Sequence, residues 1–359
     1  MRKVIISGGG TGGHIFPAVA IANEIKSRYP DCEILFIGAK GRMEMQKVPQ
    51  AGYQIEGLDI AGLQRKLDPK NLLLPFKVIK SLLQARSIIK RFKPEVAVGV
   101  GGYASAPMLF MAQMAGIPTL IQEQNSFAGL TNRILAKRAK KICVAYPNMD
   151  QVFQAEKIVL TGNPVRKDIA SGQASREEAL KFFGLESDKP VLLAIGGSLG
   201  ARTINTALKE GAEQVSKAGI QLLWQCGKSA YPNLKDINQG GIQVHEFIQR
   251  MDLAYAAADV VISRAGALSV SELCLVAKPS ILVPSPHVAE DHQTKNAKVL
   301  ADAGAAILVK DSEAGQILVD EAISLTKRAD LKTKLSNAVR GLAYPEADKK
   351  IVDCLEGLL

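Results

Sequence analysis

The stretch that decides the fold is KVIISGGGTGGH, residues 3–14. A short apolar run leads into a glycine-rich turn, and an alanine-rich helical pattern follows. A second stretch of the same kind, VLLAIGGSLGAR, occupies residues 191–202. A strand, a glycine turn and a helix N-terminus present backbone N–H groups and the positive end of a helix dipole to one point, which favours phosphate. Two such units predict two nucleotide-fold domains that face a shared cleft.

Short apolar strands alternate with helical patterns along the rest of the chain, as in parallel sheets covered by helices on both faces. The fold class predicted is α/β, with two Rossmann-like doubly wound domains. Strands are expected near residues 3–7, 33–37, 95–99, 118–121, 141–144, 190–195, 220–225, 259–262, 280–283 and 305–308. The first half should also hold helices near 17–28, 72–92, 104–115 and 126–138.

The domain boundary is predicted at Gly162-Asn163-Pro164, because these residues interrupt regular structure. The first domain is expected at residues 1–163 and the second at residues 164–345. Residues 346–359 are expected to form a C-terminal helix that could pack back on the first domain.

The composition is that of a globular protein, with 47% hydrophobic and 22% charged residues among 359. No apolar run reaches the roughly 18–20 residues that a spanning helix needs, and residues 1–3 lead straight into a strand without a secretory signal. The five cysteines are scattered in apolar contexts, so we expect buried thiols in a reducing cytoplasm and no metal cage.

Positive charge is concentrated in the first half of the chain. Residues 1–165 hold 22 Lys and Arg against 11 Asp and Glu, whereas residues 166–359 hold 23 against 24. This excess indicates either a solvated helix face or a surface for a polyanion or an anionic membrane. A nucleic-acid partner is not expected, because aromatic residues make up only 5% and Trp224 is the sole tryptophan.

The segment 72–92 is both apolar and basic. Its apolar residues include Leu72, Phe76 and Ile79, and Lys77 and Lys80 lie between them. Such a helix can lie in a membrane interface. It can equally be a core helix with one solvent-exposed side.

The first glycine turn fits the G-x-G-x-x-G spacing of dinucleotide folds at Gly8, Gly10 and Gly13. The acid that should end the second strand is absent, since Gly38-Ala39-Lys40 stands there, which counts against NAD and FAD. His14 should sit at the helix N-terminus, where the dipole favours the neutral imidazole of a general base. A capping or packing histidine is the alternative.

Further polar clusters follow predicted strands. They are Gly101-Gly102-Tyr103, Gln122-Glu123-Gln124-Asn125, Ala267 to Glu272, and the loop from Pro284 to Ala297. Ser269 and Glu272 can form a capping box at the start of a helix. Alternatively, Glu272 accepts both hydroxyls of a ribose.

The ordered motifs resemble the MurG family, the bacterial N-acetylglucosaminyltransferases of the lipid-linked stage of peptidoglycan synthesis. They are GGTGGH at 9–14, GGY at 101–103, EQN at 123–125, GNPVR at 162–166, GGSLGA at 196–201 and GALSVSE at 266–272. The resemblance spans essentially the whole chain. It implies the GT-B glycosyltransferase fold and inverting transfer of N-acetylglucosamine from UDP-N-acetylglucosamine (UDP-GlcNAc). The acceptor would be the C4 hydroxyl of undecaprenyl-pyrophosphoryl-N-acetylmuramoyl-pentapeptide (lipid I), and the product lipid II.

The resemblance also implies where each substrate binds. The C-terminal domain would hold the UDP-sugar, with Arg166 and Ser198 at the diphosphate, Ile248 at the uracil and Glu272 at the ribose. The full donor set is Thr11, Gly12, Gly13, Asn125, Arg166, Ser198, Ile248, Ala267, Leu268, Ser269, Val270, Ser271, Glu272 and Gln293. The N-terminal domain would hold the acceptor at the cytoplasmic face of the cell membrane, as a peripheral protein with possible cell-wall synthesis partners. Gly101, Gly102, Tyr103, Leu72, Phe76, Ile79, Lys77 and Lys80 are the residues expected there.

The sequence departs from the family pattern at Gln122, where the family usually has histidine, and at Ala106 and Ala265. We expect His14 to be the catalytic base, with Glu123 as the second candidate. No Asp-x-Asp pair occurs, so no metal or other cofactor is expected. The alternatives left open are another GT-B enzyme, such as a diacylglycerol glycosyltransferase or a UDP-sugar epimerase, and a non-enzymatic nucleotide-binding or membrane scaffold protein.

Overall fold

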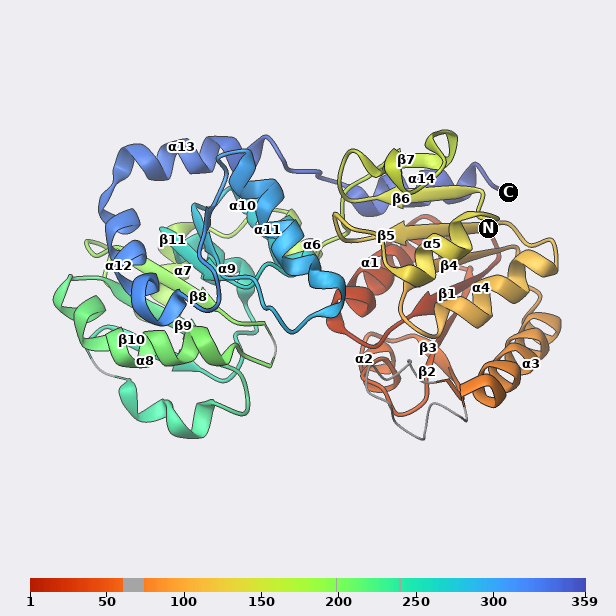
Figure 1. The fold of residues 1–359 in the computed structure, drawn as a ribbon, viewed down its shortest axis with the longest axis horizontal. Coiled ribbons are helices and arrows are strands. Elements are labelled where there is room, and N and C mark those ends of the chain that lie inside the picture. The colour runs from red at the N-terminus through yellow and green to blue at the C-terminus, as the bar shows by residue number, and fades with distance from the viewer. Residues whose placement is uncertain (61–73, 198, 239) are drawn as a thin grey trace. The chain divides into compact units, whose positions relative to one another are not determined.

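The computed structural model describes residues 1–60, 74–197, 199–238 and 240–359. The chain forms two α/β units (Figure 1). One contains Met1–Arg166 together with Glu346–Leu359, and the other contains Lys167–Pro345. The prediction of two Rossmann-like domains is confirmed, since each unit is built on a parallel sheet with helices between the strands.

Among its described residues, the first unit has a seven-stranded sheet in the order β3-β2-β1-β4-β5-β6-β7. The strands are β1 (Lys3–Gly8), β2 (Glu33–Ala39), β3 (Gln54–Leu58), β4 (Val96–Gly101), β5 (Thr119–Glu123), β6 (Lys141–Val144) and β7 (Ile158–Leu160). The helices are α1 (Gly12–Arg28), α2 (Glu44–Gln50), α3 (Leu74–Phe92), α4 (Ser105–Met114), α5 (Leu130–Ala136) and α14 (Ala347–Glu356). The strand order reverses between β1 and β4, where α/β proteins bind ligands.

Alternate side chains of β1 enter two separate cores. Ile5 packs in the core under α3, α4 and α5, whereas Val4 and Ile6 pack with Ile21 of α1 and Ile351 of α14 on the other face (Figure 1). All of these side chains are fully buried. A strand whose two faces are both buried must be apolar throughout, which explains the continuous apolar run that the sequence shows.

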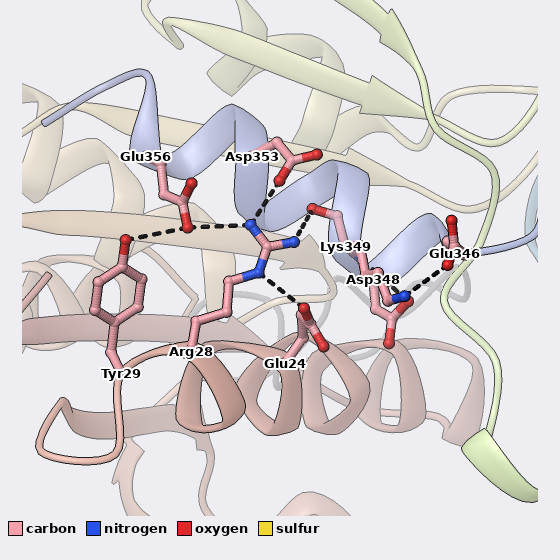
Figure 2. A network of polar contacts seen from close by, with 8 residues as sticks. All are labelled: Glu24, Arg28, Tyr29, Glu346, Asp348, Lys349, Asp353 and Glu356. Carbon is pink, nitrogen blue, oxygen red and sulfur yellow. Dashed lines mark hydrogen bonds and ion pairs between the residues drawn. The ribbon is translucent and has the colours of Figure 1, made fainter.

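Helix α14 is attached to α1 by a network of charged groups (Figure 2). The Arg28 guanidinium donates to Glu24 (2.8 Å), Asp353 (2.5 Å) and Glu356 (3.1 Å). Tyr29 adds a hydrogen bond from its hydroxyl to Glu356. These hydrogen bonds raise the pKa of Arg28, and the bond to Asp353 has the largest effect. The segment that follows the second unit therefore completes the first one.

The second unit repeats the plan with, among its described residues, a six-stranded sheet in the order β10-β9-β8-β11-β12-β13. The strands are β8 (Val191–Ile195), β9 (Gln221–Gln225), β10 (Ile242–His245), β11 (Val260–Ser263), β12 (Ser280–Leu282) and β13 (Ile307–Leu308). The helices are α6 (Lys167–Ala170), α7 (Arg176–Phe183), α8 (Arg202–Lys217), α9 (Met251–Ala257), α10 (Ala267–Val276), α11 (His292–Asp302), α12 (Ala314–Lys327) and α13 (Ala329–Arg340). The fully buried Trp224 packs in the core with residues of α8 and α12.

Among the described α-helices and strands, six escaped the sequence prediction: α2, α6, α7, β3, β7 and β10. Both β3 and β7 are short and only partly buried, so their sequences lack a long apolar run. Helix α2 contains Pro49 and is a short segment with little periodicity. Helix α1 begins at Gly12 rather than near residue 17, so His14 lies in its first turn.

The cysteines are free thiols, and Cys32, Cys143, Cys226 and Cys274 are buried while Cys354 is partly exposed. In the part of the chain that the structure describes, no helix is both long and apolar enough to cross a membrane.

Arg28→Ala should loosen α14 from α1, because one guanidinium serves three carboxylates. We expect a loss of about 1–2 kcal/mol in the stability of the first unit and faster amide exchange across α14, measured by hydrogen-exchange mass spectrometry. Arg328→Ala is the matched control, since its pair with Asp330 is exposed and 3.9 Å long. Equal exchange in the two variants would contradict the network's role.

Candidate active site

Two glycine turns meet at the point where the strand order of the first unit reverses. The Gly9 N–H donates to the Gly101 carbonyl (3.3 Å). A Cβ on Gly102, which has φ +87°, would lie 2.4 Å from the Gly9 carbonyl oxygen. Neither the positive φ nor this contact tolerates a side chain. The turn after β1 and the turn after β4 therefore form one continuous backbone surface.

His14 lies on this surface with a defined orientation. Its Nδ1 is 2.9 Å from the Gly9 carbonyl oxygen and 3.4 Å from Thr11 Oγ1. Since a carbonyl oxygen only accepts, Nδ1 carries the proton, and the neutral ring keeps its lone pair on Nε2. A Cβ on Gly101 would lie 2.9 Å from Nε2, so the ring needs this glycine. This tautomer is the one that a general base requires.

Thr11, Gly12 and Gly13 surround the histidine at the start of α1. Thr11 is the N-cap residue by its backbone and is exposed, without a side-chain capping bond. Gly12 and Gly13 are partly exposed in the first turn. They lie where the resemblance to the glycosyltransferases expects the donor sugar and phosphate.

The first glycine turn was expected to hold phosphate, and the structure corrects this at Gly10. The Gly10 N–H donates to Glu44 Oε2 (2.8 Å), and the other carboxylate oxygen accepts from Ala39 N (3.0 Å). An internal carboxylate thus occupies the position of the expected anion. Sequence reasoning missed Glu44, although it follows the second strand closely, because its side chain turns back toward the first turn.

Glu123, the second candidate base, ends β5 and is only 2% exposed. Its carboxylate accepts bonds from the backbone of Asn125 and Gly129 and from the side chains of Asn125 and Asn132. Burial raises the pKa of Glu123, and these donors oppose the shift. The carboxylate holds the loop before α5, so the geometry favours a positioning role for Glu123 and leaves His14 as the better base.

Gln122, where the family usually has histidine, is a fully buried structural amide. Its Nε2 donates to Asn163 Oδ1 (2.9 Å), and Asn163 Nδ2 donates to the Gln124 carbonyl (2.9 Å). Gln124 in turn donates to the Val100 carbonyl (2.7 Å). This network joins β5, β4 and the predicted domain boundary. Sequence gave no sign of it, because its members are far apart along the chain.

The glycine turn of the second unit follows β8 and precedes α8. Ser198 lies outside the described residues. A Cβ on Gly200 would lie 1.9 Å from the Cys226 carbonyl oxygen, and Gly227 packs against the same turn with φ +85°. The Gln225 side chain bonds to this turn and to the segment after β10. Its Nε2 donates to the Gly197 carbonyl (3.1 Å), and its Oε1 accepts from Ile248 N (2.8 Å). The expected diphosphate turn and the expected uracil contact are thus joined by one side chain.

Helix α10 presents the expected ribose contact. It begins at Ala267 with Gly266 as its N-cap residue, so Ser269 lies inside the first turn. The capping-box alternative for Ser269 and Glu272 is therefore wrong. Glu272 Oε2 instead accepts the Tyr255 hydroxyl (2.9 Å), which orients the carboxylate. The other expected donor residues on this helix are Leu268, which is partly exposed, Val270, which is buried, and Ser271, which bonds to the Ala267 carbonyl.

Two further contacts shape this end of the sheet. Gln293, near the start of α11, accepts from Ser285 N (2.8 Å), which ties the helix to the loop after β12. Arg264, after β11, pairs with Asp311, whose other oxygen accepts from Thr203 of α8 (2.9 Å). Sequence reasoning missed Asp311, because nothing in the sequence near this residue signals its partners. Arg166, expected at the diphosphate, is the last residue of the first segment of the first unit and is partly buried.

Helix α3 exposes large apolar side chains in its first half, and its second half buries one side against the core. Phe76 is 72% exposed and Ile79 is 56% exposed, whereas Ile88 is buried. Lys77 and Lys80 are exposed beside them, and Lys80 pairs with Asp59 (3.0 Å). The buried side chains of the second half fit the core-helix alternative, and the membrane-interface role of the exposed first half stays a prediction. Leu72 lies outside the described residues, and Tyr103 is a separate exposed aromatic side chain after β4.

Comparisons with known proteins agree with this arrangement. The glycosyltransferase family 28 N-terminal domain matches residues 4–144, and the family 28 C-terminal domain matches residues 191–350. Two curated relatives bear the name UDP-N-acetylglucosamine–N-acetylmuramyl-(pentapeptide) pyrophosphoryl-undecaprenol N-acetylglucosamine transferase. That of Cytophaga hutchinsonii is 57% identical, over 98% of this chain and 95% of the relative. That of Porphyromonas gingivalis is 54% identical, over 98% and 94%. The crystal structure of Acinetobacter baumannii MurG is similar with a TM-score of 0.81 at 33% identity, over 99% of this chain and all of that one.

Glu272→Gln should weaken binding of UDP, because one charged acceptor for the ribose hydroxyls is lost. A hydrogen bond to a charged group contributes roughly 1.5–3 kcal/mol, so we expect a Kd higher by about 10- to 100-fold in titration calorimetry. Glu321→Gln on α12 is the control and should bind UDP like the unaltered protein. An unchanged Kd for Glu272→Gln would remove this residue from the donor site.

Proposed function

The chain belongs to the MurG family of bacterial N-acetylglucosaminyltransferases, and we propose that it transfers N-acetylglucosamine from UDP-GlcNAc to lipid I, forming lipid II for peptidoglycan. The observation that carries this proposal is the identity of more than half of all residues with curated transferases over nearly their whole length. The motifs that hold His14, Glu272 and the two glycine turns all lie within the matched range. A non-enzymatic scaffold is accordingly set aside.

We assign the proton transfer to His14. In an inverting transfer, the acceptor C4 oxygen attacks the anomeric carbon, the bond from that carbon to the β-phosphate oxygen breaks, and UDP leaves. The hydroxyl proton must go to a base. His14 Nε2 suits this step, because the bond from Nδ1 to the Gly9 carbonyl keeps the lone pair on Nε2. Gly101 and Gly102 remain, with Tyr103, the residues expected at the acceptor.

We propose that groups of the protein stabilise the negative charge of the departing UDP. The N-terminus of α8 follows the second glycine turn, and a helix N-terminus stabilises negative charge. Arg166 and Ser198 remain the expected direct contacts, and Glu272 and Ile248 would orient the nucleoside. We expect turnover without a bound metal ion or cofactor, because the sequence lacks an Asp-x-Asp pair.

We also propose that the first unit binds the anionic surface of the inner membrane on its cytoplasmic side, where lipid I is anchored. Helices α3, α4 and α5 pack side by side, and each exposes large apolar side chains. This apolar face consists of Phe76, Ile79, Leu83, Phe110, Met114, Leu130 and Ile134. Exposed Lys77, Lys80 and Arg86 lie among them on α3. Apolar insertion combined with basic side chains is typical of peripheral binding to anionic lipid.

His14→Ala should reduce kcat for transfer from UDP-GlcNAc to lipid I by about 10²- to 10⁴-fold, the usual contribution of a general base. Binding of UDP should be retained, because the residues expected at the uracil and the ribose, Ile248 and Glu272, lie in the second unit. Radiolabelled transfer and calorimetry measure the two quantities. Lost UDP binding with normal turnover at saturating donor would make His14 a binding residue.

The unaltered protein distinguishes the remaining enzymes by its product. Lipid II is expected from UDP-GlcNAc and lipid I. Recovery of an epimeric sugar nucleotide, or transfer to diacylglycerol in place of lipid I, would overturn the proposal.

Replacing Ile79 and Leu83 together by Glu should abolish flotation with vesicles that contain phosphatidylglycerol, because charge on the apolar face prevents insertion. The melting temperature should change little, since both side chains are exposed. Ile317→Glu, on the exposed surface of the second unit, is the control and should float normally. Equal binding of the unaltered protein to phosphatidylcholine and to anionic vesicles would contradict the electrostatic part of the proposal.

A further inference from the structure

One peptide unit stands between a buried carboxylate and the imidazole assigned as the base. The carbonyl of the Gly9–Gly10 peptide accepts from His14 Nδ1 (2.9 Å). The N–H of the same peptide, on Gly10, donates to Glu44 Oε2 (2.8 Å). Carboxylate, peptide and imidazole are thus joined in one chain of hydrogen bonds.

The surroundings of Glu44 hold its carboxylate at this turn. The side chain is 1% exposed, and its second oxygen accepts from Ala39 N (3.0 Å). A Cβ on Gly9 would lie 2.2 Å from the Glu44 Cδ, and a Cβ on Gly38 would lie 2.5 Å from its Cγ. Both glycines therefore leave room for the carboxylate. Its two oxygens each accept a backbone N–H.

We propose that Glu44 is a positioning residue for His14, and that it acts through the intervening peptide. The carboxylate polarises the peptide, which makes the Gly9 carbonyl a stronger acceptor for Nδ1–H. This fixes the tautomer with its lone pair on Nε2 and stabilises the imidazolium that forms when Nε2 takes the acceptor proton. The carboxylate of a Ser-His-Asp triad has the same effect by direct contact. The inference rests on the proposed function of His14 as the base.

The other charged groups of the elements packed around α1 have their own partners. On α14, Asp353 and Glu356 engage Arg28 at the opposite end of the helix, and Lys349 pairs with Glu346. On β1, Lys3 stands at the strand end remote from the turn and pairs with Glu33 of β2. At the end of β5, Glu123 accepts from Asn132 Nδ2, an atom that would lie 3.7 Å from a Cβ on Gly101. On α2, Lys47 bonds to Gln50, so Glu44 is the charged group of this helix that meets the turn.

Glu44→Gln tests the relay. We expect kcat to fall by about 10- to 100-fold, less than the roughly 10⁴-fold loss when the directly bonded carboxylate of a Ser-His-Asp triad is replaced, with the KM for UDP-GlcNAc unchanged. The acid limb of the kcat–pH profile should move to lower pH, because the imidazolium loses stabilisation and the ring protonates at lower pH. An acid limb at its original position would overturn the proposal.

A measurement on His14 itself is independent of substrates. Nitrogen-15 NMR of the unaltered protein at neutral pH should show the tautomer with the proton on Nδ1, and the Glu44→Gln protein should show a lower midpoint for titration of this ring. The opposite tautomer in the unaltered protein, or equal midpoints, would overturn the relay. This holds even if Glu44→Gln folds poorly, since the first result needs no variant. Failure of the unaltered protein to form lipid II would instead overturn the proposed function.

Glu24→Gln is the matched control. Glu24 is also a buried carboxylate, and it lies on α1 itself, but its partner is Arg28. We expect it to lower stability while leaving the acid limb and the His14 titration in place. A shift as large as that of Glu44→Gln would show that general loosening of α1 explains both effects, and would overturn the specific role of Glu44.

Discussion

The first unit depends on the close approach of two glycine turns, one after β1 and one after β4. Gly102 lies so near the Gly9 carbonyl that no side chain fits. Ser105 strengthens the junction, because its hydroxyl lies within hydrogen-bond distance of both the Ser7 carbonyl (2.6 Å) and the Gly101 carbonyl (3.0 Å). The position of His14 follows from this junction, since its ring bonds to one turn and lies against the other.

The two glycine turns have similar sequences and different surroundings. In the first unit a carboxylate from α2 bonds to the turn. In the second unit the turn packs on Gly227 and is linked by Gln225 to Ile248. A glycine-rich turn therefore specifies close backbone approach, and the neighbouring side chains determine what approaches it. This difference is consistent with donor binding in the second unit and acid–base chemistry in the first.

Sequence patterns predicted both sheets, because fully buried strands such as β1 and β8 are continuous apolar runs. They missed β3 and α2, where burial is partial or the helix is too short for a period to appear. The resemblance identified the residues expected at the donor and His14 as the expected base, and these roles stay predictions. It did not predict the contacts of Glu44, Asn163 or Asp311, since each meets its partner only after distant segments fold together. Contacts of that kind leave no local signal in a single sequence.

The return of α14 to the first unit has a consequence for the order of folding during synthesis. Ile351, Val352 and Leu355 fill the core beside Val4 and Ile6, yet the ribosome makes them after the entire second unit. Until they emerge, one face of the first sheet keeps an uncovered apolar strip. The second unit needs no later segment to complete its core, because its strands and helices are contiguous in the chain. The second unit can therefore reach its native state first. The first unit becomes complete only when α14 has been synthesised.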